Sequence, residues 1–512
     1  MRRGRRDSLF DHRPHLTLHE GNAMNRASTL ALVLLAFSGA AQPKDLAGVF
    51  EDAVHNDPVI RQADANRLAA REARPQALAA LLPQLIGTAG ISGAHTAGFQ
   101  DQVFQPPTAE RFQITTDTNT KQWAVNLRQN VFSWANWMAL KEAGREVAQA
   151  EATYQAAEQQ LILRVAQAYF NVLAAADGLE ANQASLEAIS RQLDQANKRF
   201  EVGLIAITDV QEAKAARDTA AAAVIAAKRT LATSEDQLQE ITGEKYPQLA
   251  KPGADMTLKS PEPADESRWV SISLEQNLSL ISSRLGAEIA RDNVRIAVGG
   301  HFPTLDLVAG RSYTQTNASE IINLPPPVPQ TSTSTPIDSK LNDRQIGLQL
   351  TVPLFAGGLT QSRVRQTQYL WIAAKEAVVQ SSRATERQAR DAYLGVISGI
   401  ARVQALRQAL ESSRTALKAT EAGYEVGTRT AVDVLNSRKT LVQAQTDYSG
   451  SRYDYIVSVL QLRLAAGNLD RPQLTEINNW LTVAAPTSPA VATPESLAPS
   501  IPPATPPPGG KP

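Results

Sequence analysis

The sequence predicts a mainly α-helical chain with a smaller β part, in which long coiled-coil helices are combined with two pairs of strands. Three observations predict this class. Long helical segments carry an unbroken heptad pattern, two pairs of strands alternate apolar with polar residues, and the second half of the chain repeats the first. Heptads indicate coiled coils, and period-two alternation indicates strands with one apolar face.

Each repeat carries one long helix with a coiled-coil seam, in which apolar and small residues recur at alternating steps of four and three. In the first repeat the seam comprises Leu161, Val165, Ala168, Val172, Ala175, Leu179, Asn182, Leu186, Ile189, Leu193, Ala196 and Phe200. In the second it comprises Ala389, Ala392, Val396, Gly399, Val403, Leu406, Leu410, Ser413, Leu417, Thr420 and Tyr424. Residues 133–202 contain no proline, and a helix of about 70 residues spans about 105 Å, far longer than an ordinary globular helix.

Four segments of about ten residues, near 85–92, 123–128, 305–313 and 345–352, are predicted strands. This length crosses an outer membrane at a tilt. The intervening segments Gln100–Thr120 and Thr316–Asp343 lack apolar periodicity and are predicted to be loops. Their alternation suits half-buried soluble strands and membrane barrel strands alike. If the strands lie in a membrane, several chains must share one barrel, because four strands cannot close on themselves and an open edge is costly in lipid.

The internal duplication places its units about 220 residues apart. Residues 56–90 resemble residues 276–310, and FEVGLIAITDV from Phe200 resembles YEVGTRTAVDV from Tyr424. We expect repeat 1 over 42–243 and repeat 2 over 271–469, each with the order helix, strand, loop, strand, long helix, turn, helix. Residues 244–270 are rich in Pro and charge and are predicted to be a connector, and residues 470–512 are predicted to be a disordered Pro- and Ala-rich tail.

The N-terminal region predicts export. Residues 24–41 place a basic start before an apolar run and a group of small residues, the order of a cleaved signal peptide. Residues 1–23 fit no signal peptide, and we interpret them as an upstream segment before the start of translation at Met24. Their three histidines are disfavoured as a metal site because the segment precedes cleavage. No cysteine follows Ala41 to carry a lipid, and no later apolar run is long enough for a transmembrane helix.

The composition excludes several classes of function. Lys plus Arg equals Asp plus Glu at 51 each, so no basic surplus indicates nucleic acid as a partner. The absence of cysteine removes disulfides, thiolate metal sites and cysteine nucleophiles, and it suits an oxidising compartment. We expect no cofactor and no metal.

Together these features resemble the TolC family of outer-membrane efflux and secretion channels, over roughly residues 45–469. The most specific motifs are FEVGLIAITDVQEAK and YEVGTRTAVDVLNSRKTL at matching points of the two repeats. The resemblance implies a homotrimer in the outer membrane of a Gram-negative bacterium. In this trimer a membrane β-barrel shared by three protomers, with four strands each, is joined to a long coiled-coil α-barrel that forms a large periplasmic part. The resemblance also implies a passive exit duct for type I protein secretion or multidrug efflux. The implied partners are outer-membrane lipid, a periplasmic adaptor, and an inner-membrane ABC or proton-driven transporter.

The resemblance assigns roles at the periplasmic end, where the family closes its pore. Asp433 matches an aspartate in a ring around the aperture, and Asn436 stands where the family's namesake carries a second aspartate, so the ring is less charged here. Tyr424 and Arg429 match residues that tie the inner helix pair to its neighbours. The matching acceptors are Thr208 and Asp209. The tips expected to dock the adaptor comprise Val202, Gly203, Leu204, Val426 and Gly427.

The residues themselves allow a simpler interpretation of the same turns. Gly203 and Gly427 can adopt the left-handed conformation that ends a helix. Thr208 and Gln211 have capping-box spacing, which would place Asp209 at the start of the returning helix. Aspartate is favoured there by the helix dipole, so the aspartates of both turns could serve only as caps.

Two other classes of protein fit the sequence less well. No GxSxG, HExxH or phosphate-binding loop occurs, and FAGGLTQS lacks the lysine of such a loop, so we expect no enzyme. A periplasmic coiled-coil adaptor or structural protein is the closer alternative, because adaptors also contain helical hairpins. Adaptors usually carry one hairpin within a β-rich chain, whereas this sequence has two hairpins that flank duplicated strand pairs.

Overall fold

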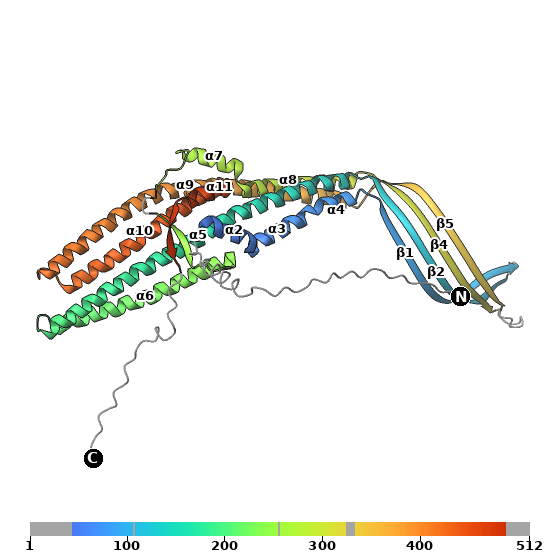
Figure 1. Ribbon diagram of the computed structural model, residues 1–512. Helices are drawn as coiled ribbons and strands as arrows, with labels where there is room; N and C mark the ends of the chain where they lie inside the picture. Colours follow the sequence, from blue (N-terminus) through green and yellow to red (C-terminus); the bar gives the residue numbers. More distant parts are fainter. Residues whose placement is uncertain (1–42, 106–107, 254–255, 324–332, 488–512) are drawn as a thin grey trace, which may run out of the picture.

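A computed structural model describes residues 43–105, 108–253, 256–323 and 333–487. The molecule is elongated, with a four-stranded sheet at one end and helical hairpins extending to the other (Figure 1). The predicted upstream segment 1–23 and signal peptide 24–41 lie outside the described residues. Among the described helices, none contains an apolar run that could cross a membrane.

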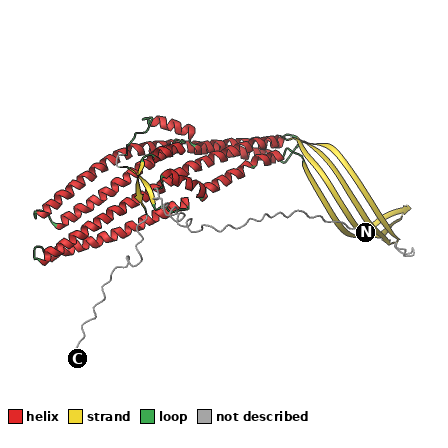
Figure 2. Cartoon of the chain, in the orientation of Figure 1, coloured by secondary structure: helices red, strands yellow, loops and turns green. Residues whose placement is uncertain are grey.

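Two helical hairpins form most of the molecule (Figure 2). One pairs α5 (Trp134–Glu201) with α6 (Ile207–Thr242), and the other pairs α9 (Leu359–Glu425) with α10 (Ala431–Ala465). The helix α5 begins at Ser133, whose hydroxyl accepts a hydrogen bond from the Asn136 amide at 3.3 Å. Its 68 residues, which span about 100 Å, confirm the long uninterrupted helix predicted from the sequence.

The predicted heptad seam lies on the buried face of both long helices. On α9 the buried seam residues recur at every seventh position and are Ala389, Val396, Val403, Leu410 and Leu417. On α5 the buried seam residues are Leu161, Val165, Ala168, Val172, Leu179, Ile189 and Ala196. The alternate α9 seam positions, such as Leu406 and Thr420, are only half-buried within one chain. The α9 seam is therefore buried along one edge within the chain, whereas α5 buries both alternating seam positions from Leu161 to Val172.

Shorter helices extend the bundle toward the sheet. The helices α2 (Leu46–Asn56), α3 (Pro58–Arg71) and α4 (Ala73–Ala79) run along α5. In the second half, α7 (Glu266–Gln276) packs on α9, and α8 (Leu278–Val298) packs between α5 and α9 before the short 3-10 helix η1 (Gly299–His301). Each half thus contains short helices, a strand pair and a long hairpin in the same order.

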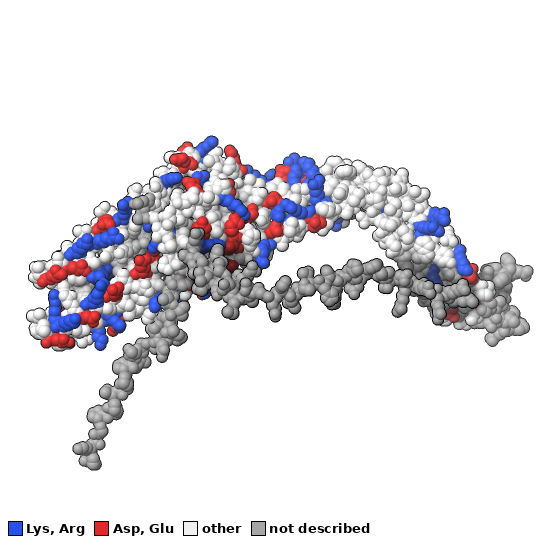
Figure 3. Space-filling model, viewed as in Figure 1, with Lys and Arg blue, Asp and Glu red and all other residues white. Residues whose placement is uncertain are grey.

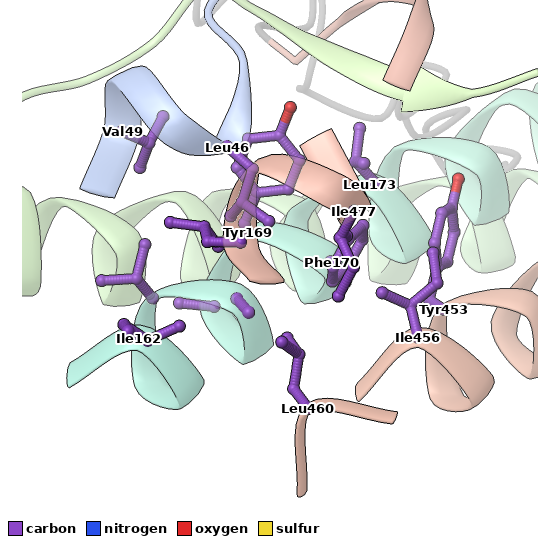
Figure 4. Close-up of a cluster of buried hydrophobic side chains, with 14 of the residues drawn as sticks. Leu46, Val49, Ile162, Tyr169, Phe170, Leu173, Tyr453, Ile456, Leu460 and Ile477 are labelled. Carbon is purple, nitrogen blue, oxygen red and sulfur yellow. The ribbon is translucent and has the colours of Figure 1, made fainter. Parts of the chain in front are cut away.

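The largest core lies midway along the helices. Figure 4 shows Leu46 of α2, Tyr169 and Phe170 of α5, and Tyr453 and Ile456 of α10 pointing toward one another. The ring centroids of Phe170 and Tyr453 lie 5.7 Å apart in a stacked arrangement. This core joins the two hairpins into one body.

A second small sheet closes over that core. The strand β3 (Gln248–Pro252) pairs antiparallel with β6 (Leu481–Pro486), after the helix α11 (Arg471–Asn478). The prediction of a disordered tail from residue 470 is therefore wrong for 471–487, and residues 488–512 lie outside the described part. Likewise, the connector 244–270 contains β3 and the start of α7. The reason is burial, because the α11 and β6 side chains that enter the core are Leu474, Ile477, Leu481 and Ala485.

The main sheet has the antiparallel order β1-β2-β4-β5. Its strands are β1 (Gln84–Gln105), β2 (Thr108–Phe132), β4 (Thr304–Asn323) and β5 (Thr333–Thr351). They are about twice as long as predicted, and most of the predicted loops 100–120 and 316–343 are strand. The prediction was wrong because it required an apolar face, whereas backbone pairing needs none and threonine, frequent in these segments, favours strands.

Candidate channel surfaces

The main sheet has one apolar and one polar face over the half nearest the helices. Successive side chains of a strand point to opposite faces, so the register defines which residues share a face. On one face the exposed apolar residues are Leu85, Ile91, Trp123, Val125, Ile346, Leu348 and Leu350. The opposite face carries Thr88, Gln122, Asn126, Ser312, Thr314, Gln345 and Gln349. Ile346 is 80% exposed, so the single chain leaves this apolar face uncovered.

The edges of the sheet are also open. Within the described residues, β1 and β5 each pair with only one neighbouring strand. Their 22 and 19 residues thus present long rows of unpaired backbone groups. In lipid each unpaired group would cost several kcal/mol, so this sheet is incomplete as a membrane-spanning structure.

The two hairpin turns lie together at the end opposite the sheet (Figure 1). Gly203 and Gly427 have φ of 75° and 79°, which confirms the predicted left-handed residues. In each turn the amide of the residue after the glycine donates a hydrogen bond to a carbonyl in the last turn of the helix. The Leu204 amide donates to the Arg199 carbonyl at 2.9 Å, and the Thr428 amide donates to the Gly423 carbonyl at 2.8 Å. These bonds satisfy carbonyls that the helix end would leave unpaired.

The starts of the returning helices differ between the two turns. In the second turn, Thr430 and Asp433 form a reciprocal capping box: the Thr430 hydroxyl accepts from the Asp433 amide at 3.2 Å, and the Asp433 carboxylate accepts from the Thr430 amide at 2.9 Å. In the first turn, Ala206 occupies the capping position and offers no side-chain bond. The predicted capping box of Thr208 and Gln211 is therefore wrong, because α6 begins at Ile207 and Thr208 already lies inside it. Asp209 does lie in the first turn of α6, as predicted.

The capping box also fixes the charge state of Asp433. Hydrogen bonds from the backbone and side chain of Thr430 lower the pKa of this carboxyl, and the nearby charge of Arg429 lowers it further. Asp433 is therefore an anion at neutral pH at the tip of the molecule.

The other residues that are predicted to act at the tips, among them Tyr424, Arg429 and Asn436, differ in their surroundings. The Tyr424 ring faces Arg199 of the other hairpin, whose guanidinium carbon lies 5.4 Å from the ring centre. Among the described side chains, no hydrogen bond or ion pair joins Tyr424 or Arg429 to Thr208 or Asp209 within the chain. Asn436 lines a cavity of about 340 Å³ between α5, α6 and α10.

The turns expected to dock a partner are exposed. Val202, Leu204 and Val426 are 69%, 73% and 76% exposed, and the two glycines lie beside them. Apolar side chains this exposed on adjacent turns form a surface that a partner could cover.

Two contacts that were not predicted from the sequence hold α9 to α10 just above the tip. Arg438 forms an ion pair with Glu421 at 2.5 Å, and the Ser437 hydroxyl donates to the Thr420 hydroxyl at 3.2 Å. A signal was present, because Glu421 and Arg438 have opposite charge and lie within about two helical turns of the predicted hairpin turn, on opposite sides of it.

The long hairpins and the open apolar sheet define the class of outer-membrane channel proteins with a helical extension. The chain matches the outer membrane efflux protein family over residues 49–244 and 269–468. It is 35% identical to the outer membrane protein TolC of Escherichia coli over 473 residues, 92% of this chain and 91% of that protein. It is 26% identical to the alkaline protease secretion protein AprF of Pseudomonas aeruginosa, over 82% of this chain and 84% of that protein. The structure of the Campylobacter jejuni CmeC outer membrane channel superposes with a TM-score of 0.66 at 17% identity, over 92% of this chain and 98% of that one.

The chain therefore belongs to the outer membrane efflux protein family. It is an outer-membrane exit duct for secretion and efflux, with an extension into the periplasm. The family is one of channels and not of enzymes. The alternative of a periplasmic adaptor or structural coiled coil is set aside by this membership.

Proposed function

We propose that three copies of the chain build one pore. The four-stranded sheets meet edge to edge, β5 of one protomer against β1 of the next, and close a barrel in the outer membrane. The observation that carries this proposal is the combination of two open edges with an uncovered apolar face. Closure pairs the backbone groups of both edges and places the apolar face against lipid. The hairpins continue the pore as a tunnel through the periplasm.

The duct works passively and takes its energy from an inner-membrane ABC or proton-driven transporter. A periplasmic adaptor links the two by docking on the exposed tips, Val202, Gly203, Leu204, Val426 and Gly427. Burial of the three apolar side chains at each protomer drives this docking. No cofactor and no nucleic acid takes part.

The tips also form the gate of the closed state. Asp433, with Asn436 one turn further along α10, surrounds the aperture in three copies. Polar links from Tyr424 and Arg429 to Thr208 and Asp209 of a neighbouring hairpin hold the aperture shut. Single hydrogen bonds stabilise by only about 0.5–1.5 kcal/mol, or about 1.5–3 when charged, so adaptor docking can release them.

The absence of cysteine makes the shared barrel directly testable. Thr88→Cys on β1, combined with single cysteines scanned along β5, should give disulfides between protomers and a trimer by native mass spectrometry in detergent. The control is Gln122→Cys with Thr314→Cys, which are cross-strand partners on β2 and β4 and should cross-link within one chain. A folded, stable monomer with no link between β1 and β5 would refute the proposal.

A further inference from the structure

Four cations occupy two rows on the apolar face of the main sheet. Arg311 on β4 lies directly opposite Arg344 on β5. Four residues further along β4, Gln315 lies between Lys121 on β2 and Lys340 on β5. The spacing of two and four residues keeps all four cations on one face. We call these four residues the basic rows.

Nothing within the basic rows balances their charge. The two rows and the row between them contain no Asp or Glu, since their other members are Gly87, Val125, Ala89, Trp123, Tyr313, Asn342, Ile91 and Gln315. The nearest carboxylate along this face, Asp338, lies outside the basic rows and forms an ion pair with Lys340 at 3.9 Å. Farther out, Asp117 pairs with His95. Like charges directly opposite each other weaken a sheet, so the Arg311–Arg344 pair calls for an external anion.

A row of aromatic residues between the two basic rows marks a boundary on the apolar face of the sheet. Trp123 and Tyr313 stack with ring centroids 6.4 Å apart, and the Arg311 guanidinium carbon lies 6.0 Å from the centre of the Trp123 ring. Nearer the helices the same face carries Leu85, Leu127, Leu307, Ile346 and Leu348. Rows of Trp and Tyr mark the interface of membrane β-barrels with the headgroup region.

The strand length places this boundary at the outer leaflet. From Leu305 to Tyr313 the strand advances about 26 Å, or about 20 Å along the membrane normal at the tilt of such barrels, close to the height of their apolar band. The basic rows therefore straddle the headgroup boundary farther from the helices. In Figure 3 the sheet beside the helices is white, and blue Lys and Arg atoms emerge only farther along it.

We infer that the basic rows bind a phosphate group of a phosphorylated glycolipid in the outer leaflet. The cations fit this partner because a guanidinium holds phosphate through two parallel hydrogen bonds, while the aromatic and apolar rows receive the acyl chains. The inference rests on the proposed function, in which this sheet crosses the outer membrane.

The test is native mass spectrometry of the full-length protein in detergent, titrated with diphosphoryl lipid A. Arg311→Gln with Arg344→Gln should weaken binding about tenfold or more, because each charge-assisted phosphate contact is strong. The control Arg407→Gln with Lys418→Gln removes two exposed cations from α9 and should bind as the unmodified protein does. Lipid A that lacks both phosphates should bind equally well to the unmodified protein, the arginine double variant and the α9 control variant.

Equal binding of diphosphoryl lipid A by the double variant and the unmodified protein would overturn the inference. If the arginine variant fails to assemble, Lys121→Gln with Lys340→Gln provides the same comparison in the outer row. The two proposals fail separately: an unmodified protein that never forms a trimer refutes the shared barrel, whereas an intact trimer with unchanged lipid binding refutes only the lipid site.

Discussion

The second hairpin turn allows the two roles of Asp433, helix cap and aperture charge, to be separated by a pair of substitutions. Thr430→Ala removes the hydroxyl that accepts from the Asp433 amide but leaves the carboxylate in place. Asp433→Asn removes the charge but retains an oxygen that can accept from the Thr430 amide. If Asp433 lines the aperture, only the second substitution should change ion selectivity.

The expected magnitudes differ enough to measure. Loss of the Thr430 cap costs about 1 kcal/mol, which raises the population of a frayed first turn of α10 about fivefold. A cation on the axis about 8 Å from three carboxylates gains about 1.5 kcal/mol even in water, which is roughly a tenfold enrichment. Three copies of Asp433→Asn remove that enrichment.

Planar-bilayer recordings in a salt gradient measure the selectivity, and hydrogen exchange of residues 431–434 measures the fraying. Thr430→Ala should raise exchange and leave the reversal potential unchanged, while Asp433→Asn should move the reversal potential toward zero. An equal fall of selectivity in both variants, or none in either, would refute the aperture ring and leave Asp433 as a cap alone.

Four further outcomes are expected. Tyr424→Phe with Arg429→Ser should raise single-channel conductance and sensitivity to vancomycin without dissociating the trimer, whereas the control Tyr369→Phe with Arg365→Ser on α9 should not; unchanged conductance would place the gate elsewhere. Ala206→Thr should create the missing capping box with Asp209 and slow hydrogen exchange at the start of α6 about fivefold. In denaturant-induced unfolding, Ile477→Ala should lower the free energy of unfolding by about 2–5 kcal/mol. The same change at an exposed apolar residue, Ile225, should lower it far less. Because the pKa of Asp433 lies below its ordinary 3.8, its cap should persist at pH 5 and be lost only as the pH falls through that lowered value, so exchange at 431–434, corrected for the intrinsic rate, should rise only below about pH 4.

The helical part of the fold follows from the sequence because its signals are local. Residues 133–202 lack proline, the heptads run without a break, and Gly203 and Gly427 end the helices where the pattern stops. Of the residues assigned to the tips, the sequence also placed Asp209 and Asp433 in the first turns of the returning helices. These features depend on neighbours within a few residues, so no knowledge of the tertiary structure was needed.

The features that escaped prediction depend on partners far away in the chain. The outer halves of the strands lack a regular apolar face, so they are identified as strands by backbone pairing, such as His95 with Asp117 in the first hairpin and Asn119 with Asn317 across about 200 residues. The α11–β6 segment resembles a loop until its few apolar side chains meet the core. The spacing of Thr208 and Gln211 suggested a cap at Thr208, but α6 begins two residues earlier and Ala206 occupies its capping position. In the second turn, by contrast, Thr430 caps α10.

The small sheet over the core brings the two ends of the folded chain together. The Asn478 side chain donates to Asp45 at 2.8 Å and accepts from the Ala47 amide at 3.1 Å, contacts that bridge more than 430 residues. Because α2 and α11 stand at opposite ends of the described chain, these contacts can form only when both segments have reached the periplasm. Truncated chains would lack this closure and would keep Leu46, Leu249 and their neighbours open to periplasmic proteases. The core midway along the helices is therefore complete only when segments from both ends of the described chain have come together.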